Sequence, residues 1–238
     1  MDKRFLLAVA CVVLLLSSCA VGSRRVVTSE RSVSGFDRVV FEGLGELTIT
    51  QDDRESLTIE AESNVMSRIT TEVRGDTLYI GWRAGVFGLS VVPTKPLRYD
   101  LTMKDVRALE LTGLGSLAAG EISTDRLAVT MGGGGRVVIR SLRAADLDLT
   151  LTGLGQVEVG GAVGRQSILV TGGGEYEGSD LESGVAAVTL TGVGKATVWA
   201  TESLDVKLTG AGTVEYYGEP RVTQNVSGFG RVRSLGTH

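Results

Sequence analysis

Histidine, cysteine, proline and aromatic residues are scarce in this chain of 238 residues. Its only histidine, His238, is the last residue, and chain ends are usually disordered. Catalytic triads and zinc sites that depend on histidine are therefore excluded. The only cysteines are Cys11 and Cys19, both near the start, so the rest of the chain has neither a thiol nucleophile nor a disulfide and must be stabilised by packing.

An excess of basic residues is also missing. The chain has 24 Lys and Arg against 28 Asp and Glu, a net charge of −4. This balance argues against nucleic acid as a partner, because that binding depends on lysine and arginine contacts to phosphate. Nucleotide motifs are absent too: Gly194-Lys195 lacks the rest of a phosphate loop. A calcium β-roll needs an aspartate where Val137 follows the run of glycines from Gly132 to Gly135, so we expect no cofactor and no metal.

The first residues have the pattern of an export signal. Lys3 and Arg4 precede an apolar run of 12 residues, Phe5 to Leu16, which is shorter than the roughly 20 residues that span a membrane. The following string, Leu16-Ser17-Ser18-Cys19, resembles the bacterial lipobox, in which the cysteine is lipidated. We expect a signal peptide at 1–18, lipidation at Cys19, a lipidated tether at 19–34, and an outer membrane lipoprotein that faces either the periplasm or the cell surface.

Glycine is abundant, with 33 residues, and much of it lies in a repeat. A Gly-x-Gly unit that follows an apolar residue and usually Thr occurs seven times, and an eighth copy, Phe41 to Gly45, stands alone. The first glycines of the seven copies are 18 to 20 residues apart: Gly113, Gly133, Gly153, Gly172, Gly192, Gly210 and Gly228. Because glycine reaches positive φ without steric cost, each unit predicts a tight turn.

Apolar and polar residues alternate on both sides of each turn, as in Leu147, Leu149 and Leu151, which predicts strands with one buried face. Every apolar column recurs at the same phase of the repeat. This favours a β-solenoid of parallel strands, in which each coil packs on its neighbours. Antiparallel hairpins around each Gly-x-Gly, forming a sandwich or barrel, are the alternative.

The stretch from Gln51 to Val106 lacks the repeat but still has the patterns of strands. Gly75-Asp76 predicts a turn, and 63–68 predicts a helical turn with Ser63 or Asn64 as its cap. The expected strands are 57–61, 69–73, 78–82, 89–92 and 97–103. We expect one all-β domain over 35–238.

Several of these segments resemble the head GIN domain family of putative auto-transporter adhesins. The resemblance is carried by Gly35 to Val39, Leu47 to Gln51, Leu57 to Ala61 and Gly75 to Ile80, together with the later Thr-Gly-x-Gly copies. It implies a right-handed parallel β-helix and a lipoprotein like those common in the Bacteroidetes. The family offers no established catalytic residues to carry over.

Three groups of side chains could form a functional surface. Asp146 with Asp148, and Glu175 with Glu177, could act as a glycosidase pair, but mixed signs in the column after the turn indicate a solvated face instead. Tyr216, Tyr217 and Trp199 could stack on a sugar, although packing at the last coils is the simpler interpretation. Apolar residues between the paired glycines either fill the solenoid corner, which we favour, or form an exposed ridge: Leu44, Leu114, Leu154, Val193, Ala211 and Phe229.

Together these patterns predict a non-catalytic lipoprotein of the cell envelope whose solenoid surface serves adhesion or scaffolding. The expected partners are the membrane, through the lipid anchor, and a glycan or an envelope protein; nucleic acid is not expected, and the oligomeric state stays open. The alternative is a carbohydrate-active enzyme of the envelope that uses one of the carboxylate pairs.

Overall fold

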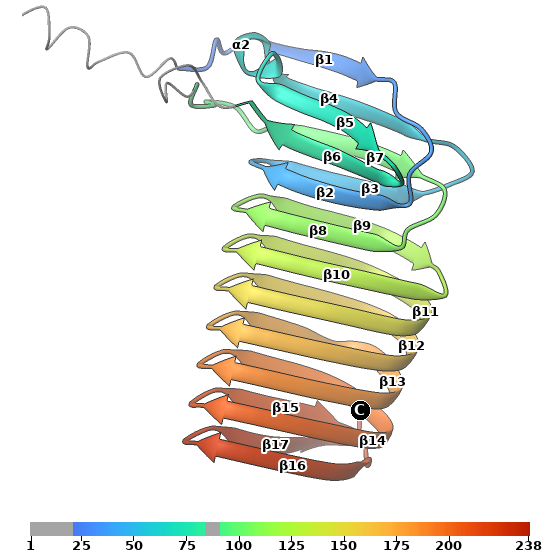
Figure 1. The fold of residues 1–238 in the computed structure, drawn as a ribbon, viewed down its shortest axis with the longest axis vertical. Coiled ribbons are helices and arrows are strands. Elements are labelled where there is room, and N and C mark those ends of the chain that lie inside the picture. The colour runs from blue at the N-terminus through green and yellow to red at the C-terminus, as the bar shows by residue number, and fades with distance from the viewer. Residues whose placement is uncertain (1–20, 84–90) are drawn as a thin grey trace, which may run out of the picture.

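The computed structural model of the protein describes residues 21–83 and 91–238. These residues form a β-solenoid (Figure 1). Each coil contributes one strand to each of two layers. Layer A holds the strands that end at the first glycine of a copy: β2 (Arg38–Gly43), β8 (Ala108–Gly113), β10 (Arg126–Gly133), β16 (Arg221–Gly228) and the second halves of β11 (Arg136–Gly153), β12 (Gln156–Gly172), β13 (Glu175–Gly192) and β14 (Lys195–Gly210).

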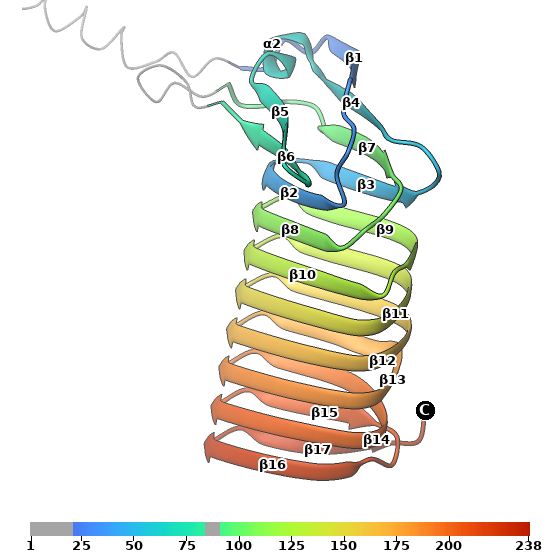
Figure 2. The same cartoon turned by 45° about the vertical axis from the view of Figure 1, so that its right-hand side comes forward.

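Layer B holds the strands that begin after the second glycine. These are β3 (Glu46–Gln51), β9 (Ser116–Ser123), β15 (Thr213–Tyr217), β17 (Arg231–Gly236) and the first halves of β11 to β14. The four long strands run through the edge that lies opposite the glycine turns, so the two layers belong to one hydrogen-bonded sheet (Figure 1, Figure 2).

Strand pairing between coils is parallel and in register, as the repeat predicts. Leu151 pairs with Met131 of the preceding coil and with Val170 of the next one. All three side chains point into the solenoid and are fully buried. Burial of an aliphatic side chain stabilises a fold by about 1.5–3 kcal/mol, so the stacked columns form the core. The solenoid is confirmed and the antiparallel hairpins are wrong.

The first glycines of the copies also stack directly on one another. From Gly113 to Gly228 their φ angles lie between 106° and 123°, a region that other residues rarely adopt. A Cβ atom on Gly192 would collide with the carbonyl oxygen of Gly172 in the preceding coil. Conformation and space therefore both require glycine at this position of the turn.

The edge opposite the turns has a looser register. Irregularities interrupt the pairing between Ile139 and Leu142 and again between Glu158 and Gly161. Coils of 18 to 20 residues can therefore stack without disturbing the glycine turns.

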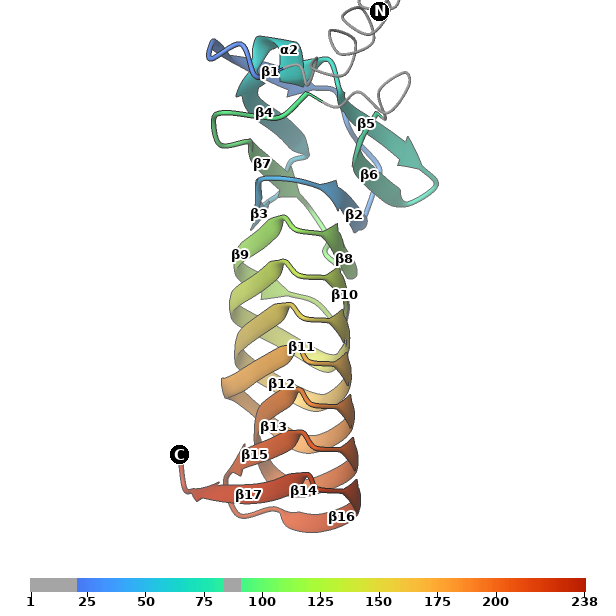
Figure 3. The ribbon, with the colours of Figure 1, turned by 90° about the vertical axis from the view of Figure 1, so that its left-hand side faces the viewer.

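Residues before β2 and between β3 and β8 form a cap on the first coil. It contains β1 (Val26–Arg31), β4 (Ser56–Glu62), α2 (Ser63–Met66), β5 (Ile69–Arg74), β6 (Thr77–Trp82) and β7 (Arg98–Met103). Strand β7 extends layer B and carries antiparallel β4 and then β1, whereas β6 extends layer A and carries antiparallel β5. The two layers spread apart in the cap (Figure 3).

The strands expected at 57–61, 69–73, 78–82 and 97–103 are present in the cap with small shifts, as is the helical turn. The expected N-cap residue of that turn, Ser63 or Asn64, is wrong: Glu62 occupies the N-cap position, and its side chain accepts no capping hydrogen bond from the turn. Of the strand expected at 89–92, residues 89 and 90 lie outside the described residues, and Val92 forms an isolated bridge with Val21. Part of the expected tether, 19–34, is also folded, since it contains β1.

Glu62 ties the start of the described chain to this cap. Its buried carboxylate accepts hydrogen bonds from the Thr94 hydroxyl at 2.6 Å, the Thr94 N–H at 2.7 Å and the Arg24 N–H at 2.6 Å. These bonds, that of the Thr94 hydroxyl above all, outweigh the effect of burial and lower the pKa of Glu62 to about 2. No helix in 21–83 and 91–238 is long and apolar enough to cross a membrane.

Candidate functional site

The apolar residues between the paired glycines are exposed, so the expectation that they fill the solenoid corner is wrong. Leu114 is 72% exposed, Leu154 78%, Val193 71% and Phe229 92%. Leu44, in the first coil, is 44% exposed. Exposed apolar groups that are gathered in one place mark surfaces that bind something.

Two features of the turn explain this orientation. First, the inner corner is already full: the side chain of Leu151 lies where the next coil has Gly174, and a Cβ atom on Gly174 would be 2.8 Å from Leu151 Cδ2. Second, the N–H of Leu154 donates to the carbonyl of Gly133 at 2.9 Å, along the solenoid axis. The backbone is held in this direction, and the side chain projects outward.

The exposed residues form a nearly continuous row along the axis. Where a coil has glycine between its paired glycines, the leucine of the preceding coil covers it. A Cβ atom on Gly134 would lie 3.2 Å from Leu114 Cδ2, and one on Gly173 would lie 3.0 Å from Leu154 Cδ2. We call this row the turn edge and define it as Leu44, Leu114, Leu154, Val193, Ala211 and Phe229.

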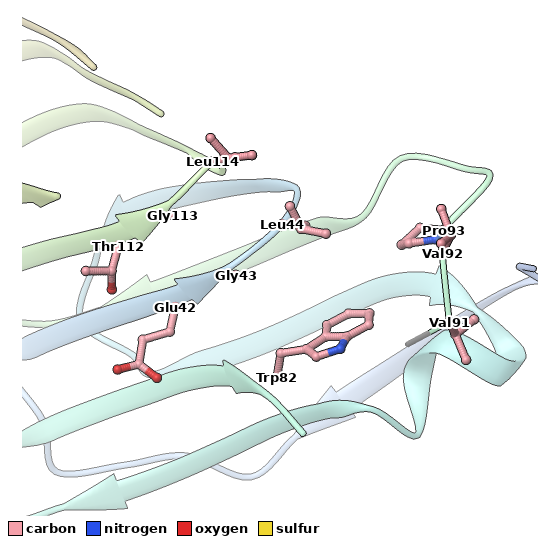
Figure 4. Close-up of a pocket in the computed structure, with 10 residues that line it drawn as sticks. All are labelled: Glu42, Gly43, Leu44, Trp82, Val91, Val92, Pro93, Thr112, Gly113 and Leu114. Atoms are coloured by element: carbon pink, nitrogen blue, oxygen red, sulfur yellow. The ribbon is translucent and has the colours of Figure 1, made fainter. Parts of the chain in front are cut away.

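A pocket of about 680 Å³ lies at the cap end of the turn edge, within the size range of small-molecule sites. Figure 4 shows Leu44 between Leu114 on one side and Trp82 with Pro93 on the other. The remaining wall is Val91, Val92, Thr112, Gly43, Gly113 and a single acid, Glu42. The lining is mostly apolar and includes two members of the turn edge, Leu44 and Leu114.

The outer face of layer B carries a ladder of charges that are paired between coils. Arg136 donates to Gln156 at 2.8 Å and to Glu158 at 2.9 Å. Lys195 lies 3.8 Å from Glu175 and 3.2 Å from Glu215. In the sequence, the positive and negative residues of this column follow no pattern. The register between coils places opposite charges next to one another.

Glu215 is the most buried member of this ladder, which also includes Arg233. Burial alone would raise the pKa of Glu215, but hydrogen bonds from Lys195 and Arg233 outweigh it and hold that pKa below its usual value. The same contact with Glu215 raises the pKa of Lys195. Both groups keep their charge near neutral pH, as suits a fixed charge pattern.

The carboxylate pairs considered for catalysis have charged neighbours of the opposite sign. Arg126 contacts Asp146 at 3.6 Å and Asp148 at 3.3 Å. Glu175 faces Lys195, as described above. The general acid of a glycosidase instead sits in apolar surroundings that raise its pKa. Within the described ranges, no three His, Cys, Asp or Glu side chains gather as a metal site would require.

Of the three aromatic residues of the last coils, Trp199 and Tyr217 contact His238 and Tyr216 packs against the core. The ring of His238 stacks on Trp199 with centroids 4.2 Å apart and meets Tyr217 edge-on at 5.1 Å. His238 is thus placed by contacts, although a chain end is usually disordered. Packing at the last coils, the simpler of the two interpretations, agrees with this arrangement.

A buried polar cluster inside the solenoid was missed from the sequence. The hydroxyl of Tyr176 donates to Gln166 at 2.9 Å, and Gln166 donates to Ser183 at 2.9 Å. A Cβ atom on Gly178 would lie 2.6 Å from the Tyr176 oxygen, so this glycine makes room for the ring. The only signal in the sequence is that Tyr176 stands in a column of otherwise aliphatic residues. A tyrosine hydroxyl buried there needs a hydrogen-bond partner. Cys19, the expected lipidation site, lies outside the described residues.

Comparison with known proteins identifies a family and a set of similar folds. Residues 35–220 match the family described as "Putative auto-transporter adhesin, head GIN domain". A putative adhesin from Bacteroides fragilis is 24% identical, with a TM-score of 0.85, over 90% of this chain and 99% of that one. A putative lipid binding protein from Parabacteroides distasonis is 25% identical, with a TM-score of 0.74, over 90% and 98%.

A putative adhesin from Parabacteroides distasonis is more distant, at 18% identity and a TM-score of 0.67, over 91% of this chain and 99% of that one. No curated protein matches the chain. At identities below 25%, the likeness concerns the fold.

Proposed function

Because the chain belongs to the head GIN domain family of putative auto-transporter adhesins, we propose that it is an envelope adhesin that binds an extended partner along its solenoid. The partner is a glycan or an envelope protein. Binding is non-catalytic, and the protein holds its partner or serves as a scaffold for it.

The paired ladder on layer B is the observation that carries this proposal. Side chains at equivalent positions recur at the spacing of neighbouring strands, about 4.8 Å, and they are held there by contacts between coils. One column reads Arg136, Gln156, Glu175, Lys195, Thr213 and Arg231. A pre-ordered ladder can bind a polymer at several places without first paying to order its side chains.

The anchor and the location belong to the same proposal. We infer that residues 1–18 are removed and that lipid on Cys19 holds the protein at the outer membrane, on its periplasmic or its outer face. Three residues after Cys19 the chain is already tied to the cap, since Gly22 donates to the carbonyl of Val92 at 2.9 Å. A lipid on Cys19 would then hold the solenoid close to the membrane.

Catalysis receives no support from the carboxylate pairs. Asp146 and Asp148 contact Arg126, and Glu175 contacts Lys195, whereas two carboxylates that cleave a glycoside need different surroundings. The adhesins of the family also point to binding, so retention of an intact partner is the expected activity.

The test uses the full-length lipidated protein in vesicles, incubated with host glycans, bacterial polysaccharides, peptidoglycan fragments and envelope proteins. We expect saturable retention of one class of partner without new products in mass spectrometry. Arg136→Ala and Lys195→Ala should weaken retention, whereas Lys207→Ala, on the outer face of layer A, should not. Cleavage products, or retention that ignores the layer B substitutions, would contradict the proposal.

Lipid binding is a second candidate function, and the apolar pocket between Leu44, Trp82 and Val92 favours it. One similar structure is described as a putative lipid binding protein. A long-chain fatty acid in the pocket should change the fluorescence of Trp82 in a saturable way. The Trp82→Phe variant, which keeps Trp199, should lose that change; an equal change in both proteins would contradict binding at this pocket.

A further inference from the structure

We propose that the turn edge is a membrane-contact surface and that the anchored solenoid lies along the bilayer with this edge against the lipid. The inference rests on the proposed lipidation of Cys19. It adds an orientation: the charged ladder of layer B stands roughly perpendicular to the membrane, open to a partner.

The place where the chain meets the solenoid is the first argument. Val21 forms a bridge with Val92, and Val92 lines the pocket that also contains Leu44 and Leu114, the first two members of the turn edge. One residue separates Cys19 from Val21, and a chain spans at most about 3.6 Å per residue. A lipid on Cys19 therefore enters the bilayer beside the beginning of the turn edge.

The straightness of the turn edge is the second argument. Its residues follow glycines that pair in strict register from Gly113 to Gly228. The turns consequently lie in a line along one side of the solenoid (Figure 1). A straight row can touch a plane at all of its members at once, and a lipid surface is a plane.

The distribution of polarity around a coil is the third argument. Beside the turn edge, layer A ends in an exposed, uncharged hydroxyl residue in five coils and in the exposed acid Glu42 in the first coil; the five are Thr112, Thr152, Thr171, Thr191 and Thr209. The opposite edge instead exposes charges, among them Asp125, Glu202 and Glu219. The solenoid is thus amphipathic in cross-section, as are structures that lie in the membrane interface with their apolar side inserted.

The charges of layer B begin next to the turns, at Arg136, Glu175, Lys195 and Arg231. In the proposed orientation these side chains stay outside the lipid, where a partner can reach them. A protein partner or a second copy would be the other occupants of this edge, and the test separates them.

The experiment places one fluorescent probe at a time on the lipidated full-length protein in vesicles of phosphatidylethanolamine and phosphatidylglycerol. Cys11 is lost with the signal and Cys19 is blocked by lipid, so Leu154→Cys or Val193→Cys supplies the single reactive thiol for an environment-sensitive dye. Glu202→Cys, on the charged edge, is the matched control. Nitroxide-labelled lipids then report which probes touch the bilayer.

We expect the probes at 154 and 193 to brighten several-fold and to be quenched by nitroxide lipids, whereas the probe at 202 stays in water. If the protein sediments with the vesicles but no probe is quenched, the inference is wrong and the anchor stands. Bright probes that lipid does not quench would mean that protein covers the edge, which also overturns it. If the protein does not sediment and Cys19 reacts with dye, the proposed anchor itself has failed.

Discussion

Leu154 lies over Gly173 of the next coil, with its Cδ2 atom 3.0 Å from the point where a Cβ atom on Gly173 would be. The leucine is nevertheless 78% exposed. It covers a neighbouring backbone and presents the rest of its side chain to the surroundings. The turn edge is therefore apolar without being part of the core.

A comparison of two leucines tests this separation of surface from core. Leu154→Ser should change the free energy of unfolding by at most about 0.5 kcal/mol, since exposed positions contribute little. Leu151→Ser, three residues earlier and fully buried, should reduce it by about 3 kcal/mol or more, because it leaves a cavity in the core. Chemical denaturation measures both. Equal losses would show that the exposed position of Leu154 is wrong.

The stacked glycines predict a strong position-dependence of glycine substitution. Gly192→Ala should destabilise the protein by about 3 kcal/mol or more, because it combines a strained positive φ with a backbone clash. Gly120→Ala is the control, since a Cβ atom there meets nothing within 4 Å and its φ is not positive. Thermal unfolding followed by circular dichroism should show a large fall in Tm for the first variant and almost none for the second.

The buried polar cluster predicts a penalty for removing one hydroxyl. Tyr176→Phe leaves Gln166 without the donor that its side-chain oxygen now has, which should cost about 1–2 kcal/mol of stability. Tyr79→Phe, which removes the hydroxyl of a partly buried tyrosine and keeps the ring beneath Arg74, should cost much less. Denaturation midpoints in urea measure the difference. Equal midpoints for the two variants would count against the buried hydrogen bond.

The pKa of Glu62 predicts how the cap responds to acid. Folding lowers this pKa from 4.5 to about 2, so the ionised carboxylate stabilises the folded state above pH 4.5, and this contribution is lost as the pH falls towards 2. Glu72 and Glu215, whose pKa values are also lowered, act in the same direction. The amides of Arg24, Thr94 and Lys95 all donate to Glu62, so their protection from hydrogen exchange, measured relative to the intrinsic rate at each pH, should fall in this pH window.

The Glu62→Gln variant is the control for acid sensitivity of the cap. It should exchange faster than the parent protein at neutral pH, because the amide is a weaker acceptor than the carboxylate. Its protection at the same three amides, relative to the intrinsic rate, should change little more between pH 4.5 and 2. A variant that keeps the full acid response would assign that response to other carboxylates.

Coil stacking could be predicted from the sequence because it depends on a local pattern that repeats. The glycines from Gly113 to Gly228 and the alternating columns fix both the turn and the inward face, and the register follows. The direction of Leu154 could not be predicted in this way. This direction depends on whether the inner corner of the turn has room for the side chain. The corner is already filled by Leu151 of the same coil, which packs over Gly174 of the next coil.

The charge pairs and the buried acid depend on longer-range contacts. Arg136 meets Glu158 one coil away, and only the register brings them together. Glu62 finds its partners at Arg24 and Thr94, which are 38 and 32 residues distant. No spacing rule links those positions, because the cap that joins them lacks the repeat.

The looseness at the edge opposite the glycine turns also bears on how the protein can evolve. In a solenoid each coil contacts only its neighbours, and here irregular pairing near Ile139 and Glu158 absorbs differences in coil length. Duplication or deletion of a whole coil would therefore preserve the remaining contacts. The length of the solenoid surface can change by inheritance in steps of about 4.8 Å, the separation of neighbouring strands, while the cap stays the same.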